Sequence, residues 1–577
     1  MFKYLKKYWL IAVLAALFMV GEVFVDLYQP RMMEQIVNQG ILGVGSGGVP
    51  DLDLVTSTGI KMILVVILGG TCGILCGVLT NICGQNYGNE VRKACFERVM
   101  HFSFEQIDAF STGSLITRIT SDVTQVQNLV MQFTRGMVRC LMFLIGGSIA
   151  LLSLDVSFRK VIFIAVPLIL TEVALIVLKT NPLFTLLQQR LDRMNSIIQE
   201  NIAGVRVVKA FVQEKREAKR FSAANDDLVE TQLRVLIMLS WMRPVMNIVL
   251  NLAIAAIIRI GAVQVEAGMM APGTVMAAVT YISQILNGMM MLAMIFQTLS
   301  RGFASWKRLR AVLETEPALK DGRGQLPEKT GAVRFDHVSF HYPGNDTPVL
   351  KDISLEIHPG EFFALIGSTG SGKSSLVQLI PRFYDASEGH VYVDGMDVKE
   401  YPLHALRERI SYVLQKSELF AMTIRENIAV SKPDASKQEI TAAAKAAQAD
   451  PFIRAQKDGY DTQVAGGGMS LSGGQRQRTA IARALLKKTK IFIFDDATSA
   501  LDLKTEAALR KQLAVGFPEA TKIMIAQRIS SIMHADRIAV IDGGMIAGLG
   551  THEELMENCA VYRDIYESQL KGGDSDE

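Results

Sequence analysis

Long apolar stretches separated by polar segments dominate the first half of the chain. A helix needs about 20 predominantly apolar residues to cross the roughly 30 Å hydrocarbon core of a bilayer. Six stretches of about this length occur, at residues 9–28, 59–82, 129–152, 161–178, 244–265 and 274–296. The pattern predicts six membrane-spanning helices. We interpret the first as a retained helix and not a signal peptide, because it is long enough to span and further spans follow.

The polar segments between the predicted spans differ in length and charge. Two of them, 84–128 and 179–243, are long, polar and helix-patterned, and the second is rich in arginine and lysine. Basic residues favour the cytoplasmic side of a membrane, and Lys3, Lys6 and Lys7 before the first span agree with this. We therefore expect a multi-pass protein of the cell membrane with both termini and both long segments on the cytoplasmic side.

Each long polar segment contains a place where a helix should break. At about 1.5 Å per residue, uninterrupted helices would carry these segments tens of ångströms into the cytoplasm. Residues 101–113 end in Ser-Thr-Gly, and residues 204–213 begin with glycine. We expect the chain to turn back at both places.

The chain changes character after the sixth span. Residues 304–315 form a charged helical pattern, and the prolines and glycines of residues 316–330 are typical of a linker. Beyond them, short β-branched or aromatic runs alternate with helical ones, as in a soluble α/β domain. We predict an α-helical polytopic membrane domain fused to an α/β domain, with boundaries at 1–310, 311–330 (the linker) and 331–577.

Composition supports a membrane protein and argues against other classes. Hydrophobic residues make up 49% of the chain and charged residues 20%, and the mean hydropathy is +0.25. The formal net charge of only +3 gives no sign of a nucleic-acid partner. The six cysteines are too dispersed for a disulfide framework. Cys72 and Cys76 lie four residues apart without a nearby histidine or acid, so we expect them to pack between helices and not to bind a metal.

A glycine-rich segment in the second half fits the phosphate-binding pattern G-x-x-x-x-G-K-[ST]. It consists of Gly367, Ser368, Thr369, Gly370, Ser371, Gly372, Lys373 and Ser374. A predicted strand at 362–366 precedes it and a predicted helix at 373–380 follows it, which is the context that such a loop requires. Backbone N–H groups and the helix N-terminus would hold phosphate oxygens. We expect Lys373 to neutralise the β- and γ-phosphates of ATP and Ser374 to bind Mg²⁺.

Two further motifs extend this assignment. Residues 491–495 form an apolar strand that ends in Asp495, as expected for a second Mg²⁺ ligand beside a phosphate loop. The pentapeptide LSGGQ opens a predicted helix at 476–486, and it consists of Leu471, Ser472, Gly473, Gly474 and Gln475. This pentapeptide resembles the signature of the ABC ATPase family. Together with the six spans, it makes nearly the whole chain similar to the half-size ABC exporters, in particular to the degenerate-site subunit of bacterial heterodimeric multidrug exporters.

The resemblance implies roles for more residues. Tyr342 would stack on adenine, although an ordinary tyrosine at the end of a strand is the alternative, and Gln415 would sense Mg²⁺ and meet the membrane domain. Residues 499–502 would communicate between two ATP sites, and the breaks near Gly113 and Gly204 would carry coupling helices. Two ATPase domains would bind two ATP molecules head to tail, with each site joining the phosphate loop of one domain to the LSGGQ of the other. The resemblance therefore implies a second half-transporter as partner.

Three positions depart from the family pattern. Asp496 stands where a glutamate normally polarises the attacking water, Gln527 replaces the switch histidine, and glycines at 466–468 lie where a glutamate is usual. A carboxylate that is one methylene shorter is withdrawn by roughly 1.5 Å, and misplacement by about 1 Å can cost about 10²-fold in rate. Glutamine cannot take up a proton at neutral pH. We expect a degenerate half of a heterodimer whose partner carries the standard Glu and His; the alternative is a slow but active enzyme.

The membrane half gives few signs of the cargo. Glu22 and Asp26 lie one turn apart in the first predicted span, Glu172 lies in the fourth and Arg259 in the fifth. Charges at membrane depth usually face a cavity, so a cationic amphipathic molecule would suit the two acids of the first span. Structural pairing or a place near the headgroups is the alternative. Four methionines of the sixth span could line an adaptable pocket or simply pack: Met289, Met290, Met291 and Met294.

These observations predict ATP-driven export of drugs or other amphipathic small molecules across the cell membrane. A lipid or peptide exporter is the alternative within transport. An ATP-gated channel or a regulatory subunit is the alternative from another class, although the spans show no periodic polar stripe that would line a pore. The six spans exclude a soluble ABC ATPase of the translation or repair type.

Overall fold

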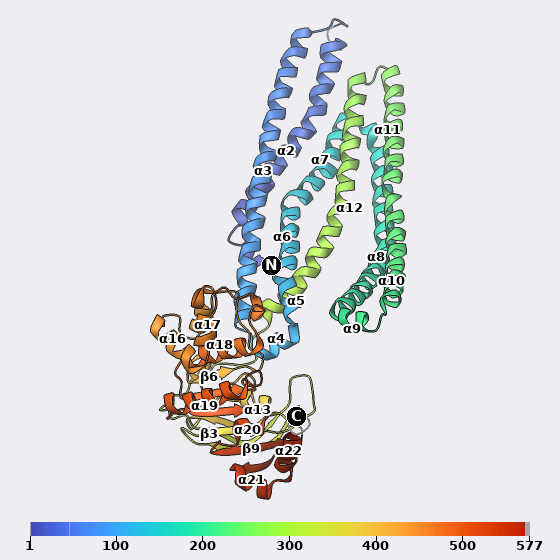
Figure 1. The fold of residues 1–577 in the computed structure, drawn as a ribbon. Helices are drawn as coiled ribbons and strands as arrows, with labels where there is room; N and C mark the ends of the chain where they lie inside the picture. The colour runs from blue at the N-terminus through green and yellow to red at the C-terminus, as the bar shows by residue number, and fades with distance from the viewer. Residues whose placement is uncertain (1, 45–46, 572–577) are drawn as a thin grey trace. The chain divides into compact units, whose positions relative to one another are not determined.

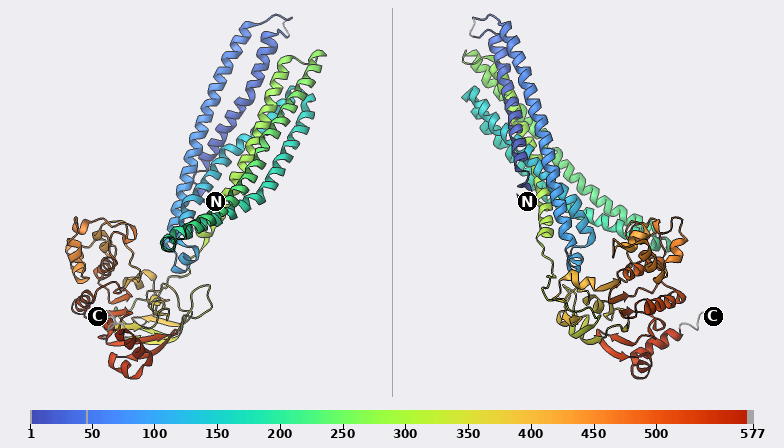
Figure 2. Two further views of the ribbon diagram at one scale, coloured as in Figure 1. Left: turned by 45° about the vertical axis from the view of Figure 1, so that its right-hand side comes forward. Right: turned by 90° about the vertical axis from the view of Figure 1, so that its left-hand side faces the viewer.

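The computed structural model describes residues 2–44 and 47–571. Within this range the chain forms two compact units. The first contains the chain up to Met100 together with Thr112–Thr315, and the second contains His101–Ser111 together with the chain from Glu316 onward. A short segment from the first half of the sequence therefore belongs to the second unit. Figure 1 labels the elements, and Figure 2 shows them from two further sides.

The first unit consists of helices and their connections, and six helical stretches in the described residues are long and apolar enough to cross a membrane. They are Trp9–Ile41, Leu52–Met100, Thr112–Leu154, Val156–Ala203, Glu214–Glu266 and Pro272–Leu292. Each span predicted from the sequence overlaps one of these stretches, so the prediction of six helices is confirmed. Most stretches are longer than predicted because the helix continues into the neighbouring polar segment.

The helices of this unit pack along their lengths. Figures 1 and 2 show α2 beside α3, and α8 beside α10 and α11. A Cβ atom on Gly69 of α3 would lie 2.6 Å from Val25 of α2, so a small residue is needed for this close approach, as is common between membrane helices. The helices are α1 (Phe2–Leu5), α2 (Trp9–Gln35), α3 (Leu52–Met100), α5 (Thr112–Thr117), α6 (Val123–Met131), α7 (Val138–Leu154), α8 (Arg159–Ala203), α9 (Val205–Ala210), α10 (Glu214–Ser240), α11 (Met242–Glu266) and α12 (Pro272–Glu314).

Both expected helix breaks are present. After α3 ends, Ser111 takes a φ of 54°, a left-handed backbone conformation, immediately before α5 begins at Thr112. Gly113 therefore lies inside α5, and the break ends two residues earlier than predicted. The second break lies at Gly204 between α8 and α9, and α10 begins at Glu214.

Helix α12 runs without interruption from the sixth span to Glu314. The charged segment 304–315 is thus a continuation of the sixth helix. Asp122 is buried and forms an ion pair with Arg308 of α12, and Arg118 donates a hydrogen bond of 3.0 Å to the Arg308 carbonyl. These contacts fix the C-terminal part of α12 to the segment that follows α5.

The second unit is built on two sheets. A four-stranded antiparallel sheet has the order β2-β1-β4-β5, and a six-stranded sheet has the order β10-β9-β3-β8-β7-β6, in which only β10 runs antiparallel to its neighbour. The strands are β1 (Val333–Phe340), β2 (Leu350–Ile357), β3 (Phe362–Ile366), β4 (Glu388–Val393), β5 (Met396–Asp397), β6 (Ile410–Val413), β7 (Ile491–Asp495), β8 (Thr521–Ile525), β9 (Arg537–Asp542) and β10 (Met545–Gly550).

The central strands of the six-stranded sheet are buried on both faces, as is usual for parallel strands. Along β3, Phe363 and Leu365 pack in the core shared with the four-stranded sheet, whereas Ala364 and Ile366 pack in the core beneath the helices of residues 424–486. The helices of this unit are α4 (Phe104–Phe110), α13 (Lys373–Leu379), α14 (Leu403–Glu408), α15 (Ile424–Ala429), α16 (Lys437–Ala446), α17 (Asp450–Arg454), α18 (Gly473–Leu486), α19 (Leu503–Gly516), α20 (Ile529–Ile532), α21 (His552–Asn558) and α22 (Ala560–Lys571).

Candidate nucleotide site

The carboxyl ends of four neighbouring parallel strands meet at one edge of the six-stranded sheet, which is where open α/β sheets bind ligands. The glycine-rich loop follows β3, Gln527 follows β8, Asp495 ends β7 and Gln415 follows β6. The register pairs Asp495 with Ile525, the last residue of β8, so neighbouring strands end at the same level. Residues that are far apart in the sequence are thereby gathered into one candidate site.

The loop after β3 has a backbone that only glycine accommodates readily. Gly367, Gly370 and Gly372 have φ values of 155°, 83° and 101°. A Cβ atom on Gly367 would lie 2.0 Å from a backbone carbonyl oxygen of β9, so a side chain is excluded there on steric grounds too. Ser368 and Thr369 are exposed in this loop. This conformation fits the predicted cradle for phosphate groups.

The lysine of the loop is held inside it. Lys373 Nζ donates to the carbonyl oxygens of Gly367 at 3.0 Å and Ser368 at 2.7 Å, and to Ser371 Oγ at 3.3 Å. Burial lowers the pKa of the Lys373 ammonium, while the carboxylates of Asp496 and Asp495 act in the opposite direction. A phosphate group entering the loop would meet this ammonium already in place, so the residues present fit ATP.

The two predicted Mg²⁺ ligands lie together. Ser374 Oγ donates to Asp495 Oδ1 at 2.7 Å, and Asp495 is only 2% exposed. Hydroxyl and carboxylate oxygens are the ligands that Mg²⁺ prefers, usually with phosphate oxygens and water completing the set. The other carboxylate oxygen, Asp495 Oδ2, accepts a 2.8 Å hydrogen bond from the hydroxyl of Tyr412, whose pKa is raised chiefly by burial. Tyr412 was not identified from the sequence.

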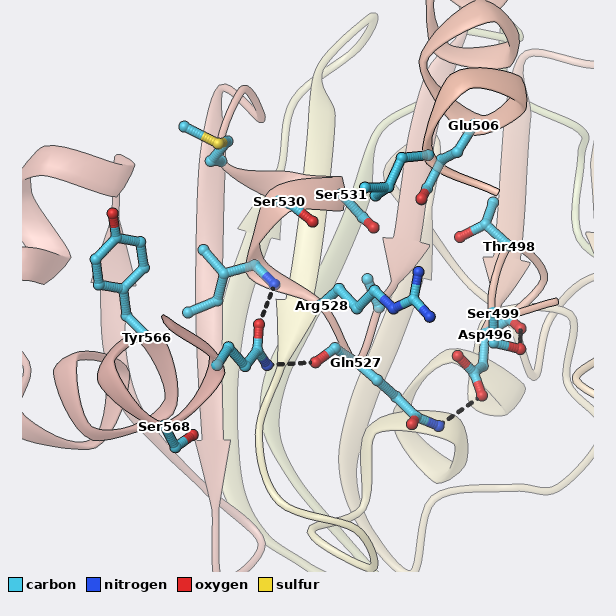
Figure 3. Close-up of a pocket in the computed structure, with 15 residues that line it drawn as sticks. Asp496, Thr498, Ser499, Glu506, Gln527, Arg528, Ser530, Ser531, Tyr566 and Ser568 are labelled. Atoms are coloured by element: carbon cyan, nitrogen blue, oxygen red, sulfur yellow. Dashed lines mark hydrogen bonds between the residues drawn. The ribbon is translucent and has the colours of Figure 1, made fainter. Parts of the chain in front are cut away.

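Asp496 is enclosed by the two glutamines. Gln527 Nε2 donates to Asp496 Oδ2 at 2.7 Å, and Gln415 Nε2 lies 3.4 Å from the same oxygen. Figure 3 shows the Gln527 side chain directed toward Asp496. Burial raises the pKa of the Asp496 carboxyl, and the two amide hydrogen bonds oppose this shift. One carboxylate oxygen of Asp496 thus accepts hydrogen bonds from both amides. Neither glutamine can accept a proton from water.

The loop that carries Gln527 is fixed by the C-terminal helix. Gln569 of α22 donates to the Gln527 carbonyl at 2.7 Å and accepts from the Ile529 backbone N–H at 2.9 Å. Gln569 and Ile529 line a cavity of about 670 Å³ together with Asp496 and Tyr566, and Figure 3 shows the last two at its wall. Gln569 was not identified from the sequence, because a glutamine in an amphipathic helix carries no signal of its partner.

The LSGGQ segment forms a helix N-terminus. Ser472 is the N-cap of α18 and forms a capping box with Gln475: Ser472 Oγ accepts from the Gln475 backbone N–H at 3.3 Å, and Gln475 Oε1 accepts from the Ser472 backbone N–H at 3.0 Å. The helix begins at Gly473, three residues earlier than predicted, so Gly473 and Gly474 lie in its first turn. Ser472 is exposed. The first backbone N–H groups of such a helix favour an anionic ligand.

A buried glutamine joins α18 to residues 499–502. Gln477 is 6% exposed; its Nε2 donates to Ser499 Oγ at 3.2 Å and its Oε1 accepts from the Ala500 backbone N–H at 3.0 Å. Asp502 then caps α19 by accepting from the Thr505 backbone N–H at 3.1 Å. The segment expected to communicate between sites is therefore held directly by the helix that LSGGQ opens. Gln477 was not identified from the sequence.

Tyr342 lies in an aromatic group beside the glycine-rich loop. Its ring makes edge contacts with Phe340 and Tyr384, at centroid distances of 4.9 and 5.3 Å, and its hydroxyl lies 2.9 Å from Ser375 Oγ. Tyr342 is half-buried, so part of the ring remains accessible. Its stacking on adenine stays a prediction.

The acids of the first span are paired with an arginine that was not identified from the sequence. Arg139 of α7 lies 3.3 Å from Glu22 and 3.7 Å from Asp26, and its guanidinium lies 5.6 Å from the centre of the Phe143 ring. The alternative of structural pairing is thus favoured for these two acids. A charged residue within the predicted third span was the signal that could have identified Arg139.

The remaining membrane residues singled out in the sequence do not gather with this group. Both carboxylate oxygens of Glu172 are buried without a hydrogen-bond partner among the described residues, and Arg259 is exposed. Met289 is 2% exposed in the helical core and Met290 packs against that core, which favours the packing role for both. Met291 is half-buried, and the side chain of Met294 lies outside the described residues.

We expect Lys373→Ala to weaken ATP binding to this chain by about tenfold or more, because a hydrogen bond to a charged group typically contributes about 1.5–3 kcal/mol. Nucleotide photolabelling or fluorescence titration of the purified chain would measure the change. Lys490→Ala is a matched control, since the ammonium of this half-buried lysine pairs with the exposed Glu519 at 2.7 Å. Undiminished labelling of the Lys373 variant would contradict the assignment.

Known proteins resemble both halves of the chain. Residues 10–290 match the family described as ABC transporter transmembrane region, and residues 350–499 match the family described as ABC transporter. The chain is 37% identical over 568 residues to "Uncharacterized ABC transporter ATP-binding protein YfiB" of Bacillus subtilis (strain 168), covering 98% of each chain. It is 34% identical over 514 residues to an "ATP-dependent lipid A-core flippase" of Syntrophus aciditrophicus (strain SB), covering 89% of this chain and 85% of the relative. Its fold is similar to that of a bacterial Atm1-family ABC exporter with ATP bound, with a TM-score of 0.82, 26% identity and 98% coverage of each chain.

Proposed function

This chain belongs to the ABC transporter family, and we propose that it is one half of a heterodimeric exporter with one hydrolytically weak and one working ATP site. Membership of the family implies ATP-driven export, with ATP and Mg²⁺ bound by the second unit. In the proposed dimer, the glycine-rich loop of this chain binds ATP, and its LSGGQ segment completes the site of the partner. Both termini and the second unit lie on the cytoplasmic side.

The contact between Gln527 and Asp496 carries this proposal. Its 2.7 Å hydrogen bond joins the two positions that depart from the family pattern of Glu and His. A short carboxylate that already receives two amide hydrogen bonds is a poor base toward water, and glutamine cannot act as an imidazole does. The LSGGQ segment, by contrast, keeps its capping box and an exposed Ser472, which supports a working contribution to the partner's site.

We propose an amphipathic small molecule as the cargo. Arg139 faces both Glu22 and Asp26, so one arginine meets two carboxylates between α2 and α7. Arg139 pairs with these acids but supplies one cation for two carboxylates; a cationic amphipathic drug fits this arrangement, because charged residues at membrane depth usually mark a substrate path. The likeness to a lipid A-core flippase supports a lipid as the second candidate.

The purified chain in lipid, without a partner, is expected to hydrolyse ATP at a rate well below the order of 1 s⁻¹, the low end of common enzyme turnover. The reason is that every site in a homodimer would combine Asp496 with Gln527. A coupled phosphate-release assay with and without vanadate measures the rate. Brisk vanadate-sensitive turnover by the homodimer would refute the heterodimer proposal.

A matched variant restores the glutamate and the histidine of the family pattern at the same time. Asp496→Glu with Gln527→His should raise the turnover of the chain alone by at least about tenfold, since a placed general base typically contributes 10²–10⁴-fold. Each single substitution should give little, because the carboxylate and the imidazole act on the same water and phosphate. If the double variant stays at the native rate while it still binds ATP, the weakness of this site has another cause.

A further inference from the structure

One carboxylate outside the nucleotide motifs is buried without a complete set of partners. Glu506 lies in the first turn of α19, where the helix N-terminus favours a negative charge. The residue is only 3% exposed, and its Oε1 atom has no hydrogen-bond partner in the part of the chain that the structure describes. A buried polar atom that lacks a hydrogen bond is costly, so such an atom in a native protein calls for an explanation. The motifs of the nucleotide site give Glu506 no role.

Glu506 lines the cavity of about 670 Å³ that lies beside the loop of Gln527. This volume falls within the range of about 300–1,000 Å³ that is usual for small-molecule sites. The walls come from the segment after β7, from α19, from the segment after β8 and from α22, all in the second unit. Figure 3 shows Glu506 and Tyr566 on opposite sides of the group of lining residues, with Arg528 between them. The cavity thus offers a carboxylate oxygen to an incoming ligand.

The charged residues at the walls favour a cation as this ligand. Glu506 and Asp496 each bring a carboxylate, and Arg528 is the cationic side chain among the described residues that line the cavity. Arg528 is exposed and does not hydrogen-bond to Glu506 Oε1, so its guanidinium can face water. Two acids against one base leave an excess of negative charge. A ligand that donates a hydrogen bond from a positive group would satisfy Glu506.

Apolar side chains line the same cavity. Leu503 is 61% exposed and Met533 is 36% exposed, and the half-buried Tyr566 also contributes to the walls. Covering such side chains with an apolar group is favourable, because it removes apolar surface from water. The combination therefore fits a molecule with a positive head and an apolar body.

We propose that this cavity is a second ligand site of the chain, which binds an organic cation with a primary ammonium head and an apolar body. The ammonium donates to Glu506 Oε1, and the apolar body lies against Leu503, Met533 and Tyr566. This site goes beyond the proposed function, because it requires neither a partner subunit nor transport.

A ligand in this cavity would act on the loop of Gln527, which forms part of its walls. Gln569 donates to the Gln527 carbonyl at 2.7 Å and accepts from the Ile529 backbone N–H at 2.9 Å, and all three residues line the cavity. Gln527 in turn donates to Asp496 at 2.7 Å. A ligand packed against these residues restricts the loop, so binding of the cation and binding of ATP should be coupled. This step alone rests on the proposed function, because it requires ATP to bind beside Asp496.

Photolabelling of the purified full-length chain in lipid nanodiscs tests the site. The probe is an alkyl diazirine with a primary amine, its alcohol analogue is the neutral control, and mass spectrometry identifies the labelled peptides. The amine should label residues 496–506, 526–533 and 560–571 at least about tenfold more than the alcohol does, as expected for a hydrogen bond to a charged group. An excess of 4-phenylbutylamine should compete. Labelling confined to peptides of α2 and α7 would support the cargo proposal and overturn this site.

Four variants test the assigned contacts. Glu506→Gln should abolish the preference for the amine, and Met533→Trp, which fills the cavity and keeps the carboxylate, should lower the labelling independently. Glu439→Gln is the matched control, because it removes an acid from the first turn of α16 in the same unit, and it should label as the native chain does. Arg528→Gln should raise the labelling severalfold, since it removes a like charge. A decrease in Arg528→Gln, or equal losses in Glu439→Gln and Glu506→Gln, would overturn the assignment.

The affinity for ATP is titrated on the same samples with and without 4-phenylbutylamine. The amine should change this affinity at least about fivefold, the lower end of typical allosteric coupling, and Glu506→Gln should lose the effect. Labelling of the cavity without any change in ATP affinity would overturn the action on the loop of Gln527. A chain that is labelled at the cavity but does not bind ATP would overturn the proposed function and support the cation site.

Discussion

Replacing Ser472 with arginine is expected to lower the ATPase activity of the assembled transporter by at least about 100-fold, the effect typical of losing one preorganised donor to a developing anion. Ser472 is exposed at the N-cap of α18, where its hydroxyl accepts from the Gln475 backbone N–H. In the proposed head-to-tail dimer this end of the helix meets the γ-phosphate held by the partner. A bulky side chain at the cap would keep the two domains from closing on that nucleotide.

Asp496→Asn in the same chain should change the activity far less, because Asp496 belongs to the weak site. The loss should fall well below the 10²–10⁴-fold that removal of a working base costs. Both variants are co-expressed with the native partner and assayed side by side for ATP hydrolysis. An Asp496→Asn variant as inactive as Ser472→Arg would make Asp496 a functioning catalytic carboxylate and end the degenerate-site interpretation.

Ser436→Arg provides the control for loss of the cap itself. Ser436 is exposed and caps α16 in the same way, with Glu439 completing its capping box. Losing either cap should cost about 0.5–2 kcal/mol in stability. Only the Ser472 variant should lose more ATPase activity than this loss of stability explains.

Arg409→Met is expected to destabilise the second unit by about 3–5 kcal/mol, because it leaves a buried charge without its partner. Arg409 and Asp394 are 3% and 1% exposed in their side chains and lie 2.6 Å apart. Asp394 also accepts from the Gly331 backbone N–H at 2.6 Å, and Arg409 donates to the Pro327 carbonyl at 2.7 Å. The pair therefore fixes the segment that leads from α12 to β1 onto the second unit.

Thermal unfolding of the purified chain, followed by differential scanning calorimetry, measures this effect. The transition of the second unit should fall by roughly 10 °C, since 1 kcal/mol shifts the midpoint of a domain of this size by about 2–4 °C. Arg425→Met removes a pair between a half-buried arginine and the exposed Asp461, at 2.9 Å, and should cost about 1 kcal/mol, because the Asp461 that remains is exposed to water. Equal shifts in the two variants would show that the buried pair has no special role.

The motifs of the nucleotide site were predictable because each is short and its chemistry is local. Gly367 and Gly372 are needed for a backbone conformation, Lys373 and Ser374 follow at fixed positions, and the capping box of Ser472 spans four residues. The six spans were predictable for a similar reason, since the length of an apolar helix is set by the thickness of the membrane. Their ends were not, because α12 and other helices continue without interruption from the apolar span into polar residues that are themselves helix-patterned, so the change in hydropathy does not mark a helix end.

The partners of these motifs were decided by the tertiary structure alone. Tyr412 meets Asp495 across 83 positions of sequence, Gln569 holds the loop of Gln527 across 42, and Arg139 pairs with Glu22 on another helix. Nothing in the local sequence of a tyrosine on a short strand, or of a glutamine on an amphipathic helix, specifies which distant group it will face. That choice follows from strand order and helix packing, which bring the ends of separate elements together. The sequence by itself therefore determined the family, the spans and the phosphate-binding chemistry. The tertiary structure decided which side chains position that chemistry, because hydrogen bonds and aromatic contacts depend on distance in space and not along the chain.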